Sequence, residues 1–384
     1  MPDIASLVLP QVALSAEEMD LFFSDETRIT APAGTVIVRE GEAGDQMFVL
    51  LTGELVITVQ DKRIDYLLPG MILGEMAMID DRPRSATVTA ATDSTLVCLN
   101  RPRFQELISR SPEFALRVMN IMSVRTRRLI EEEVRRQRME EELAIGRRIQ
   151  LSLLPHGCPQ VPEYEFVAGY RAAHEVGGDL YDFIVQPDAP TQVHVVIADV
   201  TGKGVPAALY MAVSRTLMHT YALEGRTPAE ALQRVNQFIL EDQTTPLFLS
   251  AFYGVLDTTV HCLTYANAGH NPPIRLKHET GEIEPLKSRG IVLGAFDAFI
   301  SEEQLCYLQP GDYVIFFTDG ITEARDASDH FFDDEGLNTV IGARPWSSAQ
   351  ELLTAIITAV DEFAAGVPQA DDFTVIVMRR KPLA

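Results

Sequence analysis

The N-terminal part of the chain alternates apolar and polar stretches over short distances. From Ile29 to about Leu99, short apolar runs recur between glycines, among them TVIV at 35–38, ELVITV at 54–59 and STLVCL at 94–99. Short runs at regular spacing are typical of antiparallel strands in a barrel or a sandwich. The pattern therefore predicts an all-β segment here.

Residues from about Pro112 to Leu154 have a different pattern. Arginine and glutamate come in blocks, and no glycine lies between Pro112 and Gly146. An imperfect apolar stripe passes through these blocks, at positions 121, 124, 130, 134, 139 and 143. The pattern predicts one long charged helix, either paired with a second copy in a dimeric coiled coil or solvated as a single connector.

After Pro155, longer apolar runs return and are mixed with helical patterns. Strand-like runs include VHVVIA at 193–198 and FTVIVM at 373–378. Helical periodicity covers about 207–223, 228–240 and 348–364. Thr227 before the second helix, and Ser347 or Ser348 before the third, are suited to N-terminal caps. Because strands and helices come in blocks, we predict an α+β domain built on antiparallel sheet.

Length and charge limit the class of protein. The chain has 384 residues, and its 55 acidic against 32 basic side chains leave a net charge of −23. This balance argues against a general nucleic-acid binder, which needs a net basic face. The basic blocks of the long helix could touch nucleic acid, but the interleaved glutamates favour a salt-bridged exposed surface. We expect two domains with a connector and no nucleic-acid partner.

The cysteines and the apolar runs indicate the location of the protein. The four cysteines, at 98, 158, 262 and 306, are far apart and have no partners at zinc spacing, so buried, reduced thiols are expected. No apolar run approaches the roughly 18 residues that span a bilayer, and no basic region precedes the short apolar stretch at the N-terminus. We expect a cytoplasmic protein with no membrane partner.

The stretch LGEMAMIDDRPRSATV at 73–88 has the residues of an anion site. Gly74 permits close backbone approach, and the next four residues could form one helical turn with free N–H groups. Arg84 supplies a planar fork for a phosphate, and Ser85 and Ala86 can add a hydroxyl and an amide. Glu75 is unusual beside a phosphate unless it faces a hydroxyl such as a ribose 2′-OH. A phosphate site and an ordinary surface loop are both compatible with this spacing.

Together with REGEAGDQMFVLLTGEL at 39–55, this stretch resembles the phosphate-binding cassette of the cyclic nucleotide-binding domain family, over about residues 15–130. The resemblance implies a jelly-roll β-barrel with flanking helices. It also implies that Glu75 holds the ribose hydroxyl, that Arg84 holds the cyclic phosphate, and that amides complete the cradle. These amides lie near Gly74, Met76, Ser85 and Ala86. Because cGMP-selective domains usually carry threonine where Ser85 stands, cAMP is the expected ligand and cGMP the less favoured one.

Several aspartates stand at the ends of apolar strands in the C-terminal part. They are Asp179 in EVGGDLYDF, Asp199 after VHVVIA, Asp319 after YVIFFT, and Asp371 and Asp372 before FTVIVM. A single aspartate at a strand end is usually a turn residue, but strands of one sheet can bring several to the same edge. Carboxylates without histidine or cysteine companions select Mg²⁺ or Mn²⁺, and two ions about 4 Å apart could activate water against a phosphoryl group. A P-loop at GKGVPAAL fails, because no Ser or Thr follows Lys203.

The motifs GGDLYDF, ADVTGKGVPAAL, YANAGHNPP, FTDGITEAR and DDFTVIV together look like the SpoIIE-type branch of the metal-dependent protein phosphatase (PPM, or protein phosphatase 2C-like) superfamily, over about residues 145–380. This resemblance implies an αββα sandwich and direct attack of metal-bound water on phosphoserine or phosphothreonine.

Carried over by position, the resemblance implies a role for each acidic residue. Asp199 would bridge two Mn²⁺ or Mg²⁺ ions and the Val200 carbonyl would bind one of them, while Asp319 and Asp371 would bind the second. These three aspartates are the predicted catalytic residues. Asp179 would be a ligand directly or through water, and Asp372 a partner of the ligands. For His270, a catalytic role and a structural hydrogen bond are both compatible with the sequence. Lys203 and Arg325 are expected to be solvated surface charges.

The segment ELAIGRRIQLSLLP at 142–155 is similar to the helix that precedes this phosphatase domain in stress-response and sporulation regulators, where it is a dimerising switch. We therefore predict a cyclic nucleotide-binding domain at 1–112, a helical, dimerising linker at 113–155 and a phosphatase domain at 156–384. The predicted substrate is a phosphorylated regulatory protein, by analogy an anti-sigma-factor antagonist. The competing classes are a non-catalytic cyclic-nucleotide receptor and, less favoured, a transcription factor.

Overall fold

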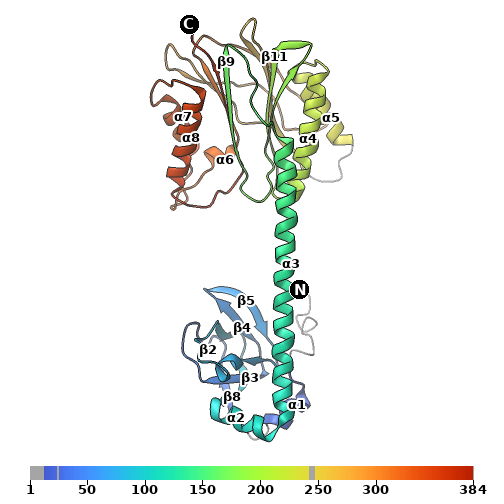
Figure 1. Ribbon diagram of the computed structural model, residues 1–384, viewed down its shortest axis with the longest axis vertical. Coiled ribbons are helices and arrows are strands. Elements are labelled where there is room, and N and C mark those ends of the chain that lie inside the picture. The colour runs from blue at the N-terminus through green and yellow to red at the C-terminus, as the bar shows by residue number, and fades with distance from the viewer. Residues whose placement is uncertain (1–12, 24–25, 242–246, 384) are drawn as a thin grey trace. The chain divides into compact units, whose positions relative to one another are not determined.

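The computed structural model describes residues 13–23, 26–241 and 247–383 (Figure 1). The chain divides into two compact units, Met1–Arg138 and Met139–Ala384. Within the described ranges, none of the helices has both the length and the apolar composition needed to cross a bilayer. All four cysteines are unpaired; Cys262 and Cys306 are buried as predicted, whereas Cys98 and Cys158 are only partly buried.

The N-terminal unit contains two four-stranded antiparallel sheets, which agrees with the predicted β segment. The first has the order β1 (Arg28–Ala31), β8 (Ser94–Asn100), β3 (Gln46–Thr52) and β6 (Ile72–Leu73). The second has the order β2 (Val36–Val38), β7 (Thr87–Ala90), β4 (Leu55–Val59) and β5 (Lys62–Leu67). Buried side chains from both sheets, including Leu50, Leu55 and Leu96, form one apolar cluster.

Helices cover the first of these sheets. They are α1 (Ala16–Phe23), α2 (Arg101–Arg110) and the beginning of α3 (Pro112–Leu153), and a 3₁₀ turn, η2 (Glu75–Met78), follows β6. Phe22, Phe23 and Phe104 each meet Phe114 of α3 edge to face, with ring centroids 5.2 to 6.0 Å apart. This aromatic cluster anchors the beginning of α3 in the N-terminal unit.

Helix α3 confirms the predicted long helix. Between Ile121 and Gln150 none of its described residues is buried, and its exposed surface carries ion pairs such as Arg128 with Glu132 at 2.8 Å. Leu129, Ile130 and further apolar side chains of this stretch are exposed as well. Charge pairs one turn apart favour the helix locally, while the apolar side chains in the middle of α3 stay exposed among the described residues.

The C-terminal unit contains two five-stranded antiparallel sheets. One has the order β10 (Leu180–Gln186), β11 (Ala189–Val200), β12 (Leu249–Asp257), β13 (Cys262–Ala268) and β16 (Glu303–Tyr307). The other has the order β15 (Ile283–Pro285), β14 (Ile274–Leu276), β17 (Tyr313–Phe317), β18 (Phe373–Arg380) and β9 (Tyr164–Arg171).

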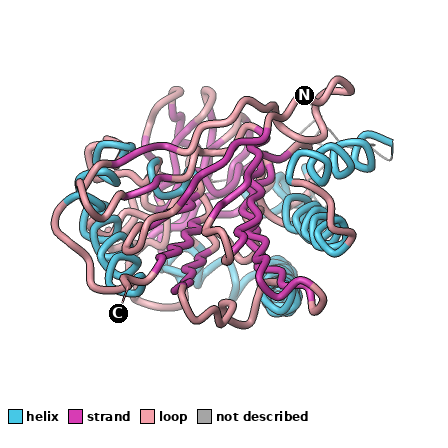
Figure 2. The backbone as a smooth tube through the Cα atoms, turned by 90° about the horizontal axis from the view of Figure 1, so that it is seen from above, coloured by secondary structure: helices cyan, strands magenta, loops and turns pink. Residues whose placement is uncertain are grey.

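Helices cover the outer faces of both sheets, and Figure 2 shows them on the two sides of the strands. They are α4 (Val205–Leu223), α5 (Pro228–Glu241), α6 (Asp319–Thr322), α7 (Asp333–Gly342) and α8 (Ala349–Ala364). One apolar cluster joins α4 and α5 to the first sheet, a second joins α7 and α8 to the other sheet, and a third lies between the sheets. The unit therefore has the αββα layers that the resemblance implies, and central strands buried on both faces explain the unbroken apolar runs.

The predicted helix caps are also present. Ser348 accepts a hydrogen bond from the Glu351 amide at 3.1 Å, and Glu351 in turn accepts one from the Ser347 amide at 2.8 Å. Thr227 and Glu230 exchange the equivalent pair at the beginning of α5. Each reciprocal pair satisfies amides that the first helical turn leaves without partners.

Candidate nucleotide and catalytic sites

The predicted phosphate cradle lies in the N-terminal unit where β6 ends. Gly74 has a φ of 73°, a left-handed conformation that favours glycine, and it begins the short turn η2. A side chain at Gly74 would place its Cβ 2.4 Å from a guanidinium nitrogen of Arg84 and 3.0 Å from the Gln46 carbonyl oxygen. The structure thus brings Gly74 and Arg84 together, as the sequence predicted.

Arg84 is folded back into this cradle. Its guanidinium donates hydrogen bonds to the Gln46 carbonyl at 2.6 Å and to the Gly74 carbonyl at 3.4 Å. It also lies directly against Gly44, where a Cβ would be 2.2 Å from the Arg84 Nε. The guanidinium that the resemblance assigns to the cyclic phosphate is thus hydrogen-bonded to backbone carbonyls.

The remaining cradle residues occupy different environments. Met76 is half exposed, Ser85 is exposed and Ala86 is partly buried, just before β7. Their amides are the groups that the resemblance assigns to the phosphate. Gly44 and Gln46 were not predicted as site residues, although both belong to the quoted glycine-rich motif.

Glu75, the expected ribose ligand, already has a cationic partner. The Arg125 side chain, from α3, lies 2.9 Å from the Glu75 carboxylate and also donates to the Ile72 carbonyl at 2.9 Å. Both side chains are largely shielded from solvent, at 27% and 13% exposure for Arg125 and Glu75. Nothing in the sequence distinguishes Arg125 from the other arginines of the helix, because the contact joins residues 50 positions apart.

In the C-terminal unit, the Asp179 side chain is buried, and two threonines donate hydrogen bonds to it. Thr318 and Thr374 both donate their hydroxyls to the same carboxylate oxygen, at 2.7 and 2.5 Å. Thr318 immediately precedes Asp319, and Thr374 belongs to β18, which follows Asp371 and Asp372. The hydroxyl pair thus connects three of the four aspartate motifs around one carboxylate.

The predicted ligands lie in a shared negative field. Burial, followed by the negative charges of Asp319 and Asp371, raises the pKa of Asp199 to about 7. Burial, followed by the charges of Glu323 and Asp371, raises the pKa of Asp319 to about 6. Burial and the charge of Asp199 also raise the pKa of Asp179. Carboxylates that raise one another's pKa favour either protons or a bound cation.

Asp372 differs from these because its carboxylate is saturated by the backbone. Ala173 donates its amide to one oxygen at 2.8 Å, and Gly178 donates to the other at 2.5 Å. The Asp179 amide is a longer third donor, at 3.4 Å. Asp372 therefore holds the loop that leads to Asp179, which is a positioning role.

Lys203 and Asp371 form an ion pair at this edge. The Lys203 ammonium lies 3.0 Å from the Asp371 carboxylate and donates to the Ala370 carbonyl at 2.5 Å. The interpretation of Lys203 as a solvated charge was therefore incomplete, because its half-exposed side chain spans from the glycine-rich turn to the segment before β18. This contact could not be read from positions 168 residues apart in the chain.

The donor set suits hard divalent cations. It consists of carboxylates and the Val200 carbonyl, and Gly178 leaves room beside that carbonyl, since a Cβ there would lie 2.9 Å from the oxygen. Over the described ranges, no three acidic, histidine or cysteine side chains are arranged closely enough to form a finished metal cluster. The residues thus fit a divalent cation through the chemistry of their oxygen donors and through the repulsion between their carboxylates, which a cation would relieve.

Gln150, in the last turn of α3, is a buried residue that the sequence analysis did not single out. Its side-chain amide donates to the Gly177 carbonyl at 2.6 Å and accepts from the Gly177 amide at 3.0 Å. Gly177 lies two residues before Asp179, and a Cβ on it would be 2.6 Å from Asp372. The end of α3 is therefore bonded directly to the loop that carries a predicted ligand.

His270 makes hydrogen bonds of the structural kind. Its Nδ1 lies 2.7 Å from the Ser250 hydroxyl, and its backbone exchanges two hydrogen bonds with the Asn267 side chain. Burial lowers the pKa of His270 to about 4, so the ring is neutral near pH 7. Ser250 faces Asp199 across the β11–β12 pair, so His270 supports the strand end that carries this aspartate.

Known families match both units. A model of the family described as stage II sporulation protein E matches residues 189–381, and a model of the cyclic nucleotide-binding domain matches residues 28–111. The phosphoserine phosphatase RsbU of Bacillus subtilis is 30% identical over 245 residues, which are 64% of this chain and 72% of that protein. A cyclic nucleotide-gated potassium channel of Rhizobium etli is 43% identical over 112 residues, 29% of this chain and 31% of the channel.

A solved structure shares the fold of the C-terminal unit. The SiaA-PP2C domain of Pseudomonas aeruginosa matches with a TM-score of 0.56 and 21% identity, covering 64% of this chain and 98% of that domain. At this identity the match demonstrates the shared fold alone.

Proposed function

Because the chain belongs to the stage II sporulation protein E (SpoIIE) family of phosphatases and carries a cyclic nucleotide-binding domain, we propose that it is a cyclic-nucleotide-regulated protein-serine/threonine phosphatase. One observation carries the regulatory part of this proposal. The same helix, α3, bears the partner of Glu75 in the nucleotide cradle and the partner of Gly177 in the loop before Asp179.

In the catalytic unit, Asp199, Asp319, Asp371 and the Val200 carbonyl would hold two Mn²⁺ or Mg²⁺ ions, with Asp179 as a further ligand directly or through water. When bound, such ions supply the Lewis acidity and the activated water that phosphoserine hydrolysis needs.

Other residues keep these donors in place. Thr318 and Thr374 orient the Asp179 carboxylate, and Asp372 holds the backbone of the loop before it. Lys203 orients Asp371, and its positive charge lowers the pKa of Asp319, against the larger effect of burial. The chain thus organises the carboxylate edge through contacts that do not depend on a bound ion.

In the nucleotide unit, Arg84 and the amides around Gly74, Met76, Ser85 and Ala86 would hold the cyclic phosphate, and Glu75 would accept the ribose hydroxyl. We favour cAMP over cGMP because Ser85 replaces threonine. A ribose hydroxyl at Glu75 competes with Arg125 for the same carboxylate. Nucleotide binding would then weaken the Glu75–Arg125 ion pair that connects the cradle to α3.

At its other end, α3 is attached to Gly177 through two hydrogen bonds of a buried glutamine. A shift or rotation of the helix would strain this attachment and move the loop that carries Asp179. We propose that the nucleotide controls assembly of the metal site in this way, with 113–155 as the linker between a domain at 1–112 and one at 156–384.

Several finer features belong to the same proposal. The exposed apolar positions of α3 support its pairing with a second copy in a dimeric coiled coil. Closure of the two N-terminal sheets into a jelly-roll barrel and a cytoplasmic location are also proposed. By analogy with RsbU, a phosphoserine phosphatase, the substrate would be a phosphorylated regulatory protein such as an anti-sigma-factor antagonist.

One assay tests the proposal. Phosphate release from a phosphoserine peptide is measured with Mn²⁺, alone and with saturating cAMP or cGMP, and hydrogen exchange along α3 is followed under the same conditions. We expect Mn²⁺-dependent release, a change in rate with cAMP, and altered exchange in α3. Regulation by the nucleotide is rejected if cAMP changes neither the rate nor the exchange.

A further inference from the structure

A cavity of about 480 Å³ adjoins the carboxylate edge of the C-terminal unit. Its wall includes Gly320 and Ala370, the chain neighbours of Asp319 and Asp371. The backbone at Gly320 lies against the segment before β18, since a Cβ there would be 1.9 Å from the Asp372 carbonyl oxygen. The cavity wall and the predicted ligands are therefore parts of one packed structure, and the volume is that of a site for a few side chains.

Two arginines stand in the lining of this cavity. Arg171, at the end of β9, donates to Gln369 at 2.6 Å, and Gln369 donates in turn to the Asp371 carbonyl at 2.5 Å. Arg325 follows α6, and its guanidinium lies 4.6 Å from the centre of the Phe331 ring. Arg171 lies 5.1 Å from the centre of the Phe373 ring in the same way. Aromatic contacts hold the planar guanidinium groups in position, and each group has more N–H donors than the bonds to Gln369, Asp361 and Asp329 use.

Both arginines are only weakly engaged by other charges. Arg171 pairs with Asp361, and Arg325 with Asp329, and the two arginine side chains are 45% and 41% exposed. Exposed ion pairs of this kind contribute little, so a ligand carboxylate can replace either partner at small cost. The charged lining residues are two arginines and one aspartate, a net charge of +1 in a chain of net charge −23.

We infer that this cavity receives the substrate segment next to the phosphoserine, and that Arg171 and Arg325 select an acidic side chain in that segment. The inference rests on the proposed phosphatase function. A phosphoserine placed at the aspartates brings its neighbours over the adjoining surface. There, apolar lining residues such as Val360 and Phe373 accept the aliphatic part of a glutamate, and the guanidinium groups bind its carboxylate through charge-assisted hydrogen bonds.

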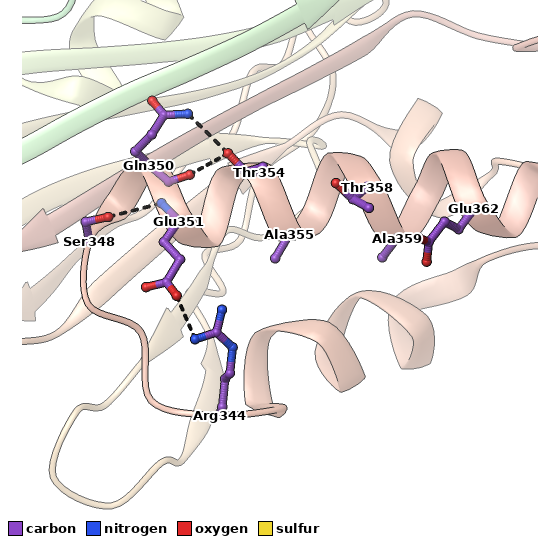
Figure 3. Close-up of a pocket in the computed structure, with 9 residues that line it drawn as sticks. All are labelled: Arg344, Ser348, Gln350, Glu351, Thr354, Ala355, Thr358, Ala359 and Glu362. Atoms are coloured by element: carbon purple, nitrogen blue, oxygen red, sulfur yellow. Dashed lines mark hydrogen bonds and ion pairs between the residues drawn. The ribbon is translucent and has the colours of Figure 1, made fainter.

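A second cavity offers a matched control. It measures about 610 Å³ and runs along α8, with none of the predicted site residues in its lining (Figure 3). Figure 3 shows Arg344 reaching Glu351, with which it pairs at 2.6 Å. Arg344 also lies 4.4 Å from the centre of the Trp346 ring. Like Arg325, it is partly exposed, at 55% against 41%, and has an acidic partner and an aromatic neighbour. Its cavity, however, is not lined by the chain neighbours of the predicted ligands.

The test uses the full chain with Mn²⁺ and two phosphoserine peptides that differ only in glutamate or glutamine on both sides of the phosphoserine. We expect kcat/KM to favour the glutamate peptide about tenfold over the glutamine peptide, and we expect the two peptides to differ in KM and not in kcat. Arg171→Gln and Arg325→Gln should each lower this preference roughly threefold, and the double variant should bring it to about one. Arg344→Gln should retain the full preference. Arg325→Glu should favour a peptide with lysines at these positions over the glutamate peptide.

Each preference is a ratio within one variant, so partial misfolding does not imitate the result. A parent protein without preference for glutamate, or a double variant that keeps it, overturns the inference. If the parent hydrolyses neither peptide, the proposed function itself fails and the inference fails with it.

Discussion

The nucleotide cradle and the carboxylate edge use similar residues but balance their charges differently. In the cradle, Glu75 is neutralised by Arg125 and the Arg84 guanidinium is bound by backbone carbonyls. At the carboxylate edge, Lys203 pairs with Asp371, and burial together with neighbouring carboxylates raises the pKa values of Asp199 and Asp319 to about 7 and about 6. The first site is satisfied by the chain alone, whereas the second is left with excess negative charge.

This difference has consequences for how each site responds to its ligand. Under the proposed function, a nucleotide would compete for contacts that Glu75 and Arg84 already make, and so would alter the surroundings of Arg125 and of α3. A cation at the carboxylate edge would instead relieve repulsion and so stabilise the arrangement already present. A site that loses contacts on binding is suited to sensing, and one that relieves repulsion is suited to holding a cofactor.

The largest expected effect comes from removing a carboxylate of the second site. Asp199→Asn should lower Mn²⁺-dependent phosphate release at least about a thousandfold, on the order of 4 kcal/mol in transition-state stabilisation. Asp188→Asn, in the exposed turn at the other end of β11, is the control and should keep full activity. An active Asp199→Asn protein would remove Asp199 from the metal site, and an inactive parent would favour a non-catalytic receptor.

Removing the two hydrogen bonds between α3 and the loop before Asp179 should have the next largest effect. Gln150→Leu keeps the side-chain volume but leaves the buried Gly177 amide and carbonyl without partners, at a cost of about 2 to 3 kcal/mol. We expect activity to fall ten- to a hundredfold and the response to cAMP to disappear. Gln137→Leu, at an exposed position of the same helix, should change neither quantity. A Gln150→Leu protein with full cAMP response would show that the coupling takes another route.

The pH dependence of the free energy of unfolding tests whether the carboxylate edge carries excess negative charge. Because the pKa of Asp199 is raised from 3.8 to about 7 in the folded protein, the folded state binds a proton that the unfolded state releases. The free energy of unfolding without metal should therefore fall as pH rises from about 4 to 7, by on the order of 2 kcal/mol. Thermal unfolding of the C-terminal unit with and without Mn²⁺ measures this. Mn²⁺ should flatten the dependence, and Asp199→Asn should reduce it, because the pKa of Asp319 stays raised. A metal-free protein that gains stability over this range would contradict the description of the site.

The smallest effect is expected from a substitution in the nucleotide cradle. Arg125→Gln removes the competitor for Glu75 and should tighten cAMP binding about fivefold, roughly 1 kcal/mol, while weakening the effect of cAMP on activity. Isothermal titration calorimetry measures the affinity. Arg128→Gln, which removes an exposed ion pair one turn along α3, serves as the control. Weaker cAMP binding in Arg125→Gln would mean that Arg125 supports the nucleotide instead of competing with it.

Much of both sites could be predicted because their residues stand in local motifs. Gly74, Glu75 and Arg84 lie within eleven positions of one another, and each carboxylate of the second site stands at the end of an apolar strand. Strand periodicity determines where such a residue is placed, and the unusual glycines mark where the backbone must approach closely. The roles assigned to the individual aspartates remain predictions that the substitutions above address.

The residues that connect the sites could not be predicted in this way. Arg125, Gln150 and Lys203 make their contacts with partners 50, 27 and 168 positions away. Each looks like an ordinary polar residue in its own segment, and α3 alone carries nine arginines.

Periodicity and residue type were enough to identify the two families, the long helix and the aspartates predicted to bind a metal. The folded structure was needed to show which charges are neutralised, by Arg125 in one site and Lys203 in the other, and that Gln150 attaches α3 to the loop before Asp179. Such contacts depend on packing between elements distant in the chain, and a local pattern contains no record of that packing.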